Sequence, residues 1–237
     1  MSINTKPFQD AYTQYRSDVA KAVTYTHHDL THTGATRQRH ARVMQARSAL
    51  INKIPSAPDP AVLQDRRPAV IESLAPKNAD QVAVQGAEWA KVQAILKSGR
   101  VIQQAVMDTT SVERLAAIAN NVEIWAYGLN TNDPEGFAED VRSLVFDRLV
   151  ALGHEGAVGA QSLDETFRTT AAWNKFLTDT IEGNGNASIQ ALYQVDPEGY
   201  AAVQAANFQF NLAGDTDDAV KRLDSLVSKP LAVAEVI

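Results

Sequence analysis

Cysteine is absent from this chain of 237 residues, which excludes disulfides, thiolate catalysis and cysteine-ligated zinc or iron–sulfur sites. Long apolar runs are also missing. None approaches the length of about 18 residues that a membrane span needs. The first ten residues, MSINTKPFQD, lack the apolar core of a signal peptide. We therefore expect a protein without membrane contact, located in the cytoplasm or incorporated into a particle assembled there.

Glycine and proline are scarce, with 12 Gly and 9 Pro, and they cluster between segments, as is typical of a helical bundle. The glycines form neither a phosphate-binding loop nor a nucleophile elbow. No glutamate has a histidine three residues later, the pair that carboxylate-bridged metal bundles use. We expect an all-α, multi-helix bundle that is not an enzyme and binds no cofactor.

The most regular helical pattern spans Asn78–Leu129. Apolar residues return there at spacings of three, four or seven, the period of one helix face. A capping box from Thr110 to Glu113 predicts a turn between two long helices. The second helix is apolar over most of its circumference, so we expect it at the centre of the fold, with Trp89 and Trp125 as core anchors.

The N-terminal segment, residues 1–54, reads as a basic helical arm with a heptad-like apolar seam. Its helical pattern is either continuous or broken near 31–36, where helix formers are few and Gly34 lies. A helix this long is usually supported by another chain. The pattern therefore predicts partner binding through the seam residues Phe8, Tyr12, Tyr15 and Val19.

A proline-rich linker at residues 55–60 is predicted to separate this arm from a helical bundle body at residues 61–237. Within the body, Asp133-Pro-Glu is a strong helix start, residues 154–160 read as a glycine-rich loop, and a further helix is expected over 163–181. The string Asp133-Pro-Glu-Gly136 returns as Asp196-Pro-Glu-Gly199. Either a duplicated helix pair or two independent helix openings of the same kind would explain this repeat.

Charge is distributed unevenly along the chain. Residues 1–58 carry eight Lys/Arg against three acids, whereas residues 129–237 carry seven against seventeen. A basic head and an acidic tail suggest either a polyanionic partner or head-to-tail contact between copies of the chain.

Two groups of residues could carry chemistry. The segment HDLTH places His28 and His32 at i and i+4, the helical spacing of a zinc pair, with Asp29 where zinc proteases have their glutamate base. No third ligand is identifiable, and a solvated polar turn with clustered histidines is the simpler interpretation. The second group could bind the phosphates of nucleic acid or an acidic protein surface. Its members are Arg37, Arg39, Arg42, Arg47 and Lys53.

The strings ARSALI at 46–51, EWAKVQAILKSGR at 88–100 and ERLAAIA at 113–119 resemble the small helical proteins encoded in the head and tail gene clusters of tailed bacteriophages, especially those of high-GC actinobacterial hosts. The resemblance implies a protein that packs against copies of itself or against capsid, connector or tail subunits. No functional residue is carried over from it.

The leading hypothesis is therefore a non-enzymatic structural or assembly protein, plausibly a phage virion or morphogenesis component, that acts through helix-mediated contacts. Its partners would be itself or other virion or assembly subunits. The alternatives are a helical nucleic-acid-binding protein that uses residues 37–53 and a zinc hydrolase built on HDLTH.

Overall fold

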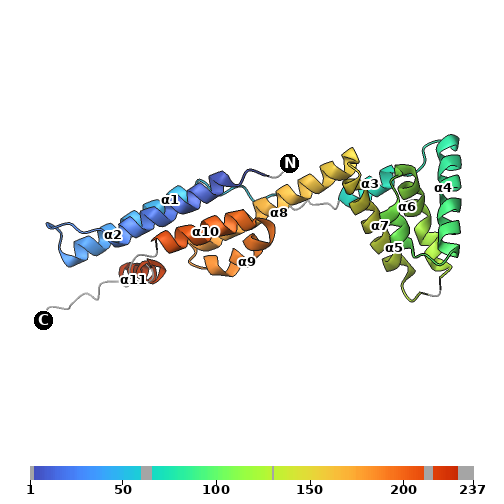
Figure 1. Cartoon of the computed structure of the whole chain (residues 1–237). Helices are drawn as coiled ribbons and strands as arrows, with labels where there is room; N and C mark the ends of the chain where they lie inside the picture. Colours follow the sequence, from blue (N-terminus) through green and yellow to red (C-terminus); the bar gives the residue numbers. More distant parts are fainter. Residues whose placement is uncertain (1–2, 60–65, 130, 211–215, 229–237) are drawn as a thin grey trace. The chain divides into compact units, whose positions relative to one another are not determined.

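The computed structural model describes residues 3–59, 66–129, 131–210 and 216–228, and every regular element within these ranges is an α-helix (Figure 1). The all-α prediction is confirmed. The chain divides into two compact units: unit 1 comprises Met1–Pro58 and Glu165–Ile237, and unit 2 comprises Asp59–Asp164. Among the described residues, no helix has both the length and the apolar character that spanning a membrane requires.

Unit 1 is a layered group of helices around one apolar core. Its helices are α1 (Lys6–Val23), α2 (His32–Ile51), the part of α8 (Glu155–Ile181) from Glu165 onward, α9 (Gly185–Val195), α10 (Pro197–Phe210) and α11 (Thr216–Ser228). Helices α1 and α2 lie side by side, and α1 also packs against α10 and α11 (Figure 1). Trp173, Phe176 and Leu177 of α8 are almost completely buried in this core.

The predicted division into arm, linker and body differs from the division that the structure shows. The segment before Pro58 folds with the segment after Glu165, and it does not project from the fold. The reason is that the apolar seam of α1 is buried against helices from the C-terminal part of the chain. The segment is two helices, because α1 ends at Val23 and α2 begins after Thr31, whose hydroxyl accepts a hydrogen bond from the Gly34 amide at 3.2 Å.

Unit 2 is built around the apolar helix α6. Its helices are α3 (Arg66–Ser73), α4 (Ala79–Lys97), α5 (Ile102–Asp108), α6 (Val112–Tyr127), α7 (Pro134–Ala151) and the first residues of α8. Helix α6 packs against both α4 and α7, which confirms its predicted central place. Trp89 and Trp125 are only half-buried and lie at the margin of this core.

The predicted hairpin over 78–129 contains three helices, because the chain turns at Gly99, which has a φ of 92° that favours glycine. The side chain of Asn78 caps α4, as predicted, by accepting a hydrogen bond from the Gln81 amide. The cap of α6 is Ser111, one residue after the predicted Thr110. Its hydroxyl accepts from the Arg114 amide and donates to Glu113.

The segments around α7 and α8 contain one confirmed helix start and one wrong prediction. Asp133 caps α7 by accepting from the Gly136 amide at 2.9 Å. The predicted loop over 154–160 is instead the first part of α8, since Ala157 and Ala160 are buried in the core of unit 2 and this burial outweighs the low helix propensity of the glycines. Residues 61–65 and 229–237 of the predicted helical body lie outside the described residues.

Candidate functional site

A polar pocket of about 260 Å³ lies within unit 1, bordered by α1, α2, α11 and the turn between α8 and α9. Two arginines line it: Arg16 from α1 and Arg47 from α2. Buried charge is costly unless it is paired, so the partners of these two guanidinium groups determine what the pocket can do.

Arg16 is the most deeply buried charge of the pocket. Only 6% of its side chain is exposed, and its Nη1 contacts Asp217 Oδ1 at 2.5 Å. The Asp217 side chain is 59% exposed, so the positive charge lies inside and the negative charge lies at the rim. The Nε of Arg16 is buried and has no hydrogen-bond acceptor among the described residues.

Arg47 of α2 is likewise more buried than the aspartate with which it pairs. Its two terminal nitrogens contact the two oxygens of Asp224 at 3.3 and 2.9 Å, and its side chain also bonds the hydroxyl of Tyr15. Burial lowers the pKa of Arg47, but the hydrogen bond and ion pair with Asp224 outweigh burial and raise the pKa overall. The side chain is 17% exposed against 34% for Asp224, and its buried Nε lacks an acceptor within the described part of the chain.

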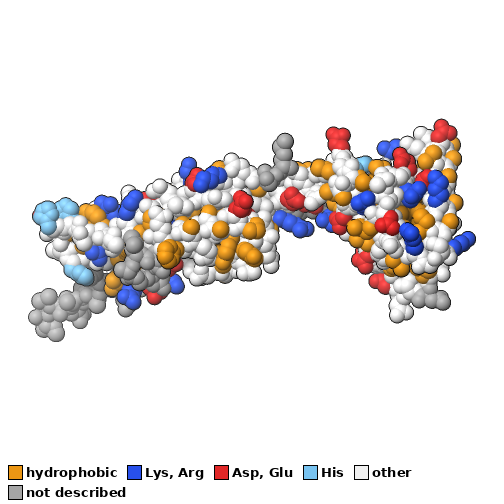
Figure 2. All heavy atoms as spheres, in the orientation of Figure 1, with side chains coloured by type: hydrophobic (Ala, Val, Ile, Leu, Met, Phe, Trp, Pro, Cys, Tyr) orange, Lys and Arg blue, Asp and Glu red, His pale blue; other side chains and the backbone are white. Residues whose placement is uncertain are grey.

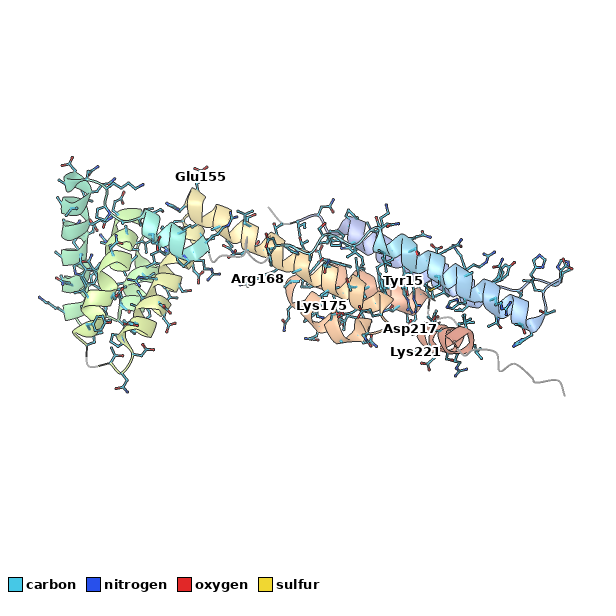
Figure 3. All side chains as sticks on the ribbon, turned by 180° about the vertical axis from the view of Figure 1, so that it is seen from behind. Tyr15, Glu155, Arg168, Lys175, Asp217 and Lys221 are labelled. Carbon is cyan, nitrogen blue, oxygen red and sulfur yellow. The ribbon has the colours of Figure 1, made fainter. Side chains whose placement is uncertain are left out.

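Two tyrosines complete the inner wall of the pocket. Burial raises the pKa of Tyr12 to about 12, and it also raises the pKa of Tyr15. Both phenols therefore remain protonated at neutral pH and can donate a hydrogen bond. The Tyr12 hydroxyl donates to Asn207 Oδ1 at 2.6 Å. Figure 3 shows Tyr15, Asp217 and Lys221 near one another in this part of unit 1.

The ion pairs at the pocket join the basic head of the chain to its acidic tail. Arg16 and Arg47 pair with Asp217 and Asp224, and His40 lies 3.4 Å from Asp224. We expected the head to meet a polyanion or the tail of another copy. For these residues that expectation is wrong, because they form ion pairs with acids of the same chain.

The predicted partner-binding seam lies on the face of α1 that packs against the core of unit 1 and borders the pocket. Tyr12, Tyr15 and Val19 are buried in the core of unit 1, and half-buried Phe8 packs against that core, with its ring 5.9 Å from Trp173. The assignment of these residues to a partner surface is therefore wrong. The apolar period of α1 correctly predicts a buried face, but the partner of that face is the chain's own C-terminal segment.

The predicted basic patch is divided by the fold. Arg39 Nε donates to the Tyr25 carbonyl at 2.7 Å, Arg42 lies over the Tyr25 ring at 3.9 Å, and Arg47 faces the pocket. Only Arg37 and Lys53 of the five are exposed without such a contact. The structure does not gather the five residues into one surface for a phosphate backbone.

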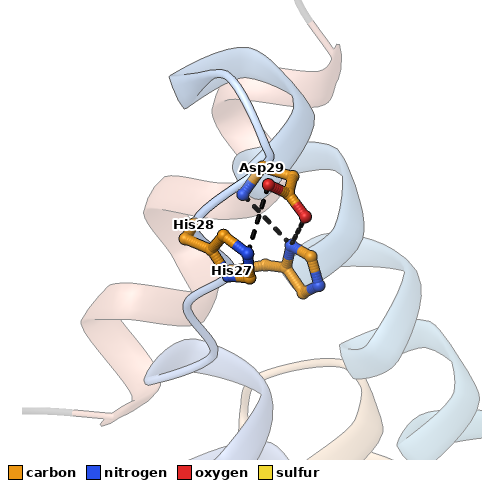
Figure 4. Close-up of side chains that lie close together, drawn as sticks. All are labelled: His27, His28 and Asp29. Atoms are coloured by element: carbon orange, nitrogen blue, oxygen red, sulfur yellow. Dashed lines mark hydrogen bonds and ion pairs between the residues drawn. The ribbon is translucent and has the colours of Figure 1, made fainter.

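The predicted zinc pair is not formed, because His28 lies in the turn between α1 and α2 whereas His32 begins α2. The turn brings together His27, His28 and Asp29, whose possible ligand atoms all lie within 4.8 Å of one another (Figure 4). His27 and His28 stack with ring centroids 4.9 Å apart, and His28 Nε2 lies 3.2 Å from Asp29 Oδ1. Two imidazoles and a carboxylate could hold a divalent metal, but all three residues are exposed, so the site encloses no substrate.

Helix α4 of unit 2 has an exposed apolar face that the main apolar period of its sequence does not predict. Val92 is the only buried residue of this 19-residue helix, and Val82 and Val84 are exposed. Figure 2 shows hydrophobic side chains along this helix. The available signal was a second apolar period, formed by alanines, on the opposite side of the helix from Val92.

Comparisons with protein-family models, curated proteins and solved structures found no significant match.

Proposed function

We propose that this chain is a non-enzymatic structural or assembly protein that acts through helix-mediated protein–protein contacts, and that α4 of unit 2 pairs with α4 of a second copy. The observation that supports this is a stripe of exposed small side chains along the whole helix. Its members are Ala83, Ala87, Ala90 and Ala94.

These alanines follow the spacing of a coiled-coil seam. They are separated by four, three and four residues, and they lie opposite Val92, the residue that attaches α4 to unit 2. Side chains this small let two helix axes approach at the short end of the usual range of roughly 8–10 Å. While these alanines are exposed to water, they do not stabilise the protein by packing. Pairing with a second helix would bury their apolar surface.

Charge supports a second copy in antiparallel orientation. Asp80 extends the alanine stripe by one step at its N-terminal end, and Lys97 extends it at the C-terminal end; both are exposed. When two copies of α4 pair antiparallel, Asp80 of each copy faces Lys97 of the other. Parallel pairing would instead place like charges together, which is unfavourable.

A phage virion or its assembly machinery is the setting that the resemblance in sequence suggests. A single helix pair buries less than the roughly 1,200 Å² of a standard stable interface, so we expect reversible association that depends on concentration.

Light scattering after size-exclusion chromatography tests the proposal on the full chain. We expect a dimer at high concentration, and we expect Ala87→Glu to be monomeric because it places a charge in the stripe. The control is Val82→Glu, which adds the same charge to an exposed position of α4 off the stripe. A wild-type monomer at all concentrations, or a dimer that survives Ala87→Glu, contradicts the proposal.

Adding duplex DNA to the same measurement tests the alternative of nucleic-acid binding through residues 37–53. A DNA complex that weakens steeply with salt would favour that alternative. The fold offers little support for it, since three of the five basic residues have partners within the chain.

A further inference from the structure

We propose that the pocket of unit 1 binds a small oxyanion, a carboxylate or phosphate group, between Arg16, Arg47 and the hydroxyl of Tyr15. This inference concerns a ligand and is independent of the pairing proposed for α4. It starts from the two buried Nε atoms, each of which has a proton and lacks an acceptor in the described structure. A buried donor without an acceptor is costly, and native structures leave few of them.

Both arginines line one pocket, so a single ligand could serve both of them. The volume of about 260 Å³ is sufficient for a small anion and its waters, since one water occupies about 30 Å³ in the liquid. Arginine is well suited to the task, because its planar fork of N–H donors matches the oxygens of carboxylate and phosphate groups.

Tyr15 supplies a third donor at the same place. Its hydroxyl oxygen bonds the Arg47 side chain, which leaves the proton of the hydroxyl available for an acceptor in the pocket. The hydroxyl of Tyr12, in contrast, already donates to Asn207. Tyr15 also lines the pocket, so three side chains that carry hydrogen-bond donors border one space.

The distribution of charge across the pocket favours an anion in spite of the nearby acids. Arg16 and Arg47 are 6% and 17% exposed, whereas Asp217 and Asp224 are 59% and 34% exposed. Water screens the carboxylates more strongly than it screens the guanidinium groups. Lys221 and Glu182, both exposed, add opposite charges at the rim, so the buried charge that an entering anion meets is that of the two arginines.

Isothermal titration calorimetry of the full chain with inorganic phosphate and, separately, with acetate tests the proposal at constant ionic strength. We expect saturable binding of at least one of the two anions, and their relative affinities distinguish a phosphate-bearing ligand from a carboxylate. Tyr15→Phe keeps the buried ring and both ion pairs but removes one donor to the anion. We expect it to weaken binding about tenfold, which is the loss of one hydrogen bond to a charged group.

Arg16→Gln should abolish binding, while circular dichroism shows whether the variant is folded. The control is Lys175→Gln, which removes one positive charge from an exposed site of unit 1 outside the pocket and should bind as the wild type does. Absence of saturable binding of both anions would overturn the proposal. Equal binding by the wild type, Tyr15→Phe and a folded Arg16→Gln would overturn it as well.

Discussion

Trp173 and Asp196 connect the core of unit 1 to the start of α10. The indole Nε1 of Trp173 donates to Asp196 Oδ2 at 2.9 Å, and the other carboxylate oxygen accepts from the Gly199 amide at 2.8 Å. In the matching string in unit 2, Asp133 caps α7 through the Gly136 amide. In both strings the aspartate accepts a hydrogen bond from the glycine amide three residues later, at the start of a helix. This shared helix cap explains the repeat without a duplicated helix pair.

Gly199→Ala should destabilise the protein more than Gly136→Ala. A Cβ at either position would meet the capping carboxylate at 2.3 Å, and such an aspartate side chain can move. At Gly199 the Cβ would also lie 2.6 Å from the buried ring of Trp173, which cannot move without disturbing the core. We expect Gly199→Ala to cost about 1–3 kcal/mol, the usual cost of overpacking, in the free energy of unfolding.

Chemical denaturation of the two variants measures this difference, with Trp fluorescence as the signal. Gly136→Ala serves as the matched control because it has the same sequence context. Equal destabilisation by both changes would show that the contact with Trp173 does not limit the size of residue 199.

Alkaline pH should destabilise unit 1 through Tyr12. Burial raises its pKa to about 12 in the folded protein, above the ordinary value of 10.0. A raised pKa means that the folded state keeps a proton that the unfolded state loses. The contribution is complete below pH 10.0 and is lost as the pH rises through about 12. We therefore expect the free energy of unfolding to fall as the pH rises above 10.0.

Ultraviolet absorbance during titration follows the ionisation of the six tyrosines. Tyr12→Phe should remove the component that ionises last, and it should cost about 0.5–1.5 kcal/mol at neutral pH through the lost bond to Asn207. Tyr193→Phe, at an exposed position, is the control. If Tyr12→Phe left the late component unchanged, Tyr12 would not be its source.

Acid should weaken unit 2 through Glu88. Its hydrogen bonds to Lys91 and Arg114 lower the pKa of the carboxyl below the ordinary value, and the Arg114 bond is 2.8 Å long. A lowered pKa stabilises the fold above the unfolded pKa, and this contribution is lost as the pH falls through the folded value. Glu88→Gln should therefore reduce the pH dependence of the unfolding free energy below a pH of roughly 4.3.

Thermal unfolding measured by circular dichroism at several acidic pH values tests this. Glu135→Gln is a suitable control, because Glu135 is exposed and bonds only Tyr127 among the contacts of the described residues. Parallel pH curves for the wild type and Glu88→Gln would argue against the role of Glu88.

The proposed pairing of α4 predicts a charge-exchange pattern. Asp80→Lys and Lys97→Asp should each weaken the dimer, since each places like charges at both ends of an antiparallel pair. The double variant Asp80→Lys/Lys97→Asp restores opposite charges and should recover association. Each change also places an unfavourable charge at a helix end, at a cost of about 0.3–1 kcal/mol in helix stability. Recovery in the double variant would therefore report the contact between copies.

Sedimentation equilibrium of the three variants measures the dissociation constants. If the double variant associated no better than the single ones, the two charges would not face each other. The antiparallel arrangement would then be wrong even if a dimer existed.

Local interactions determined much of this protein from the sequence alone. The helical class follows from the apolar period, and the starts of α4 and α7 follow from the capping side chains of Asn78 and Asp133, which bond amides three residues away. The central place of α6 follows from its apolar circumference. These features depend on neighbouring residues, so a linear pattern contains them.

Only the tertiary structure decided which surfaces meet. The seam of α1 was visible as a period, but a period does not identify the partner that buries it. Charge asymmetry likewise could not say whether the head meets the tail of the same copy. Arg16 and Asp217 lie 201 residues apart in sequence and contact each other because α1 and α11 pack on one core. The pocket between them exists for the same reason, since long-range packing is not encoded in any local stretch of residues.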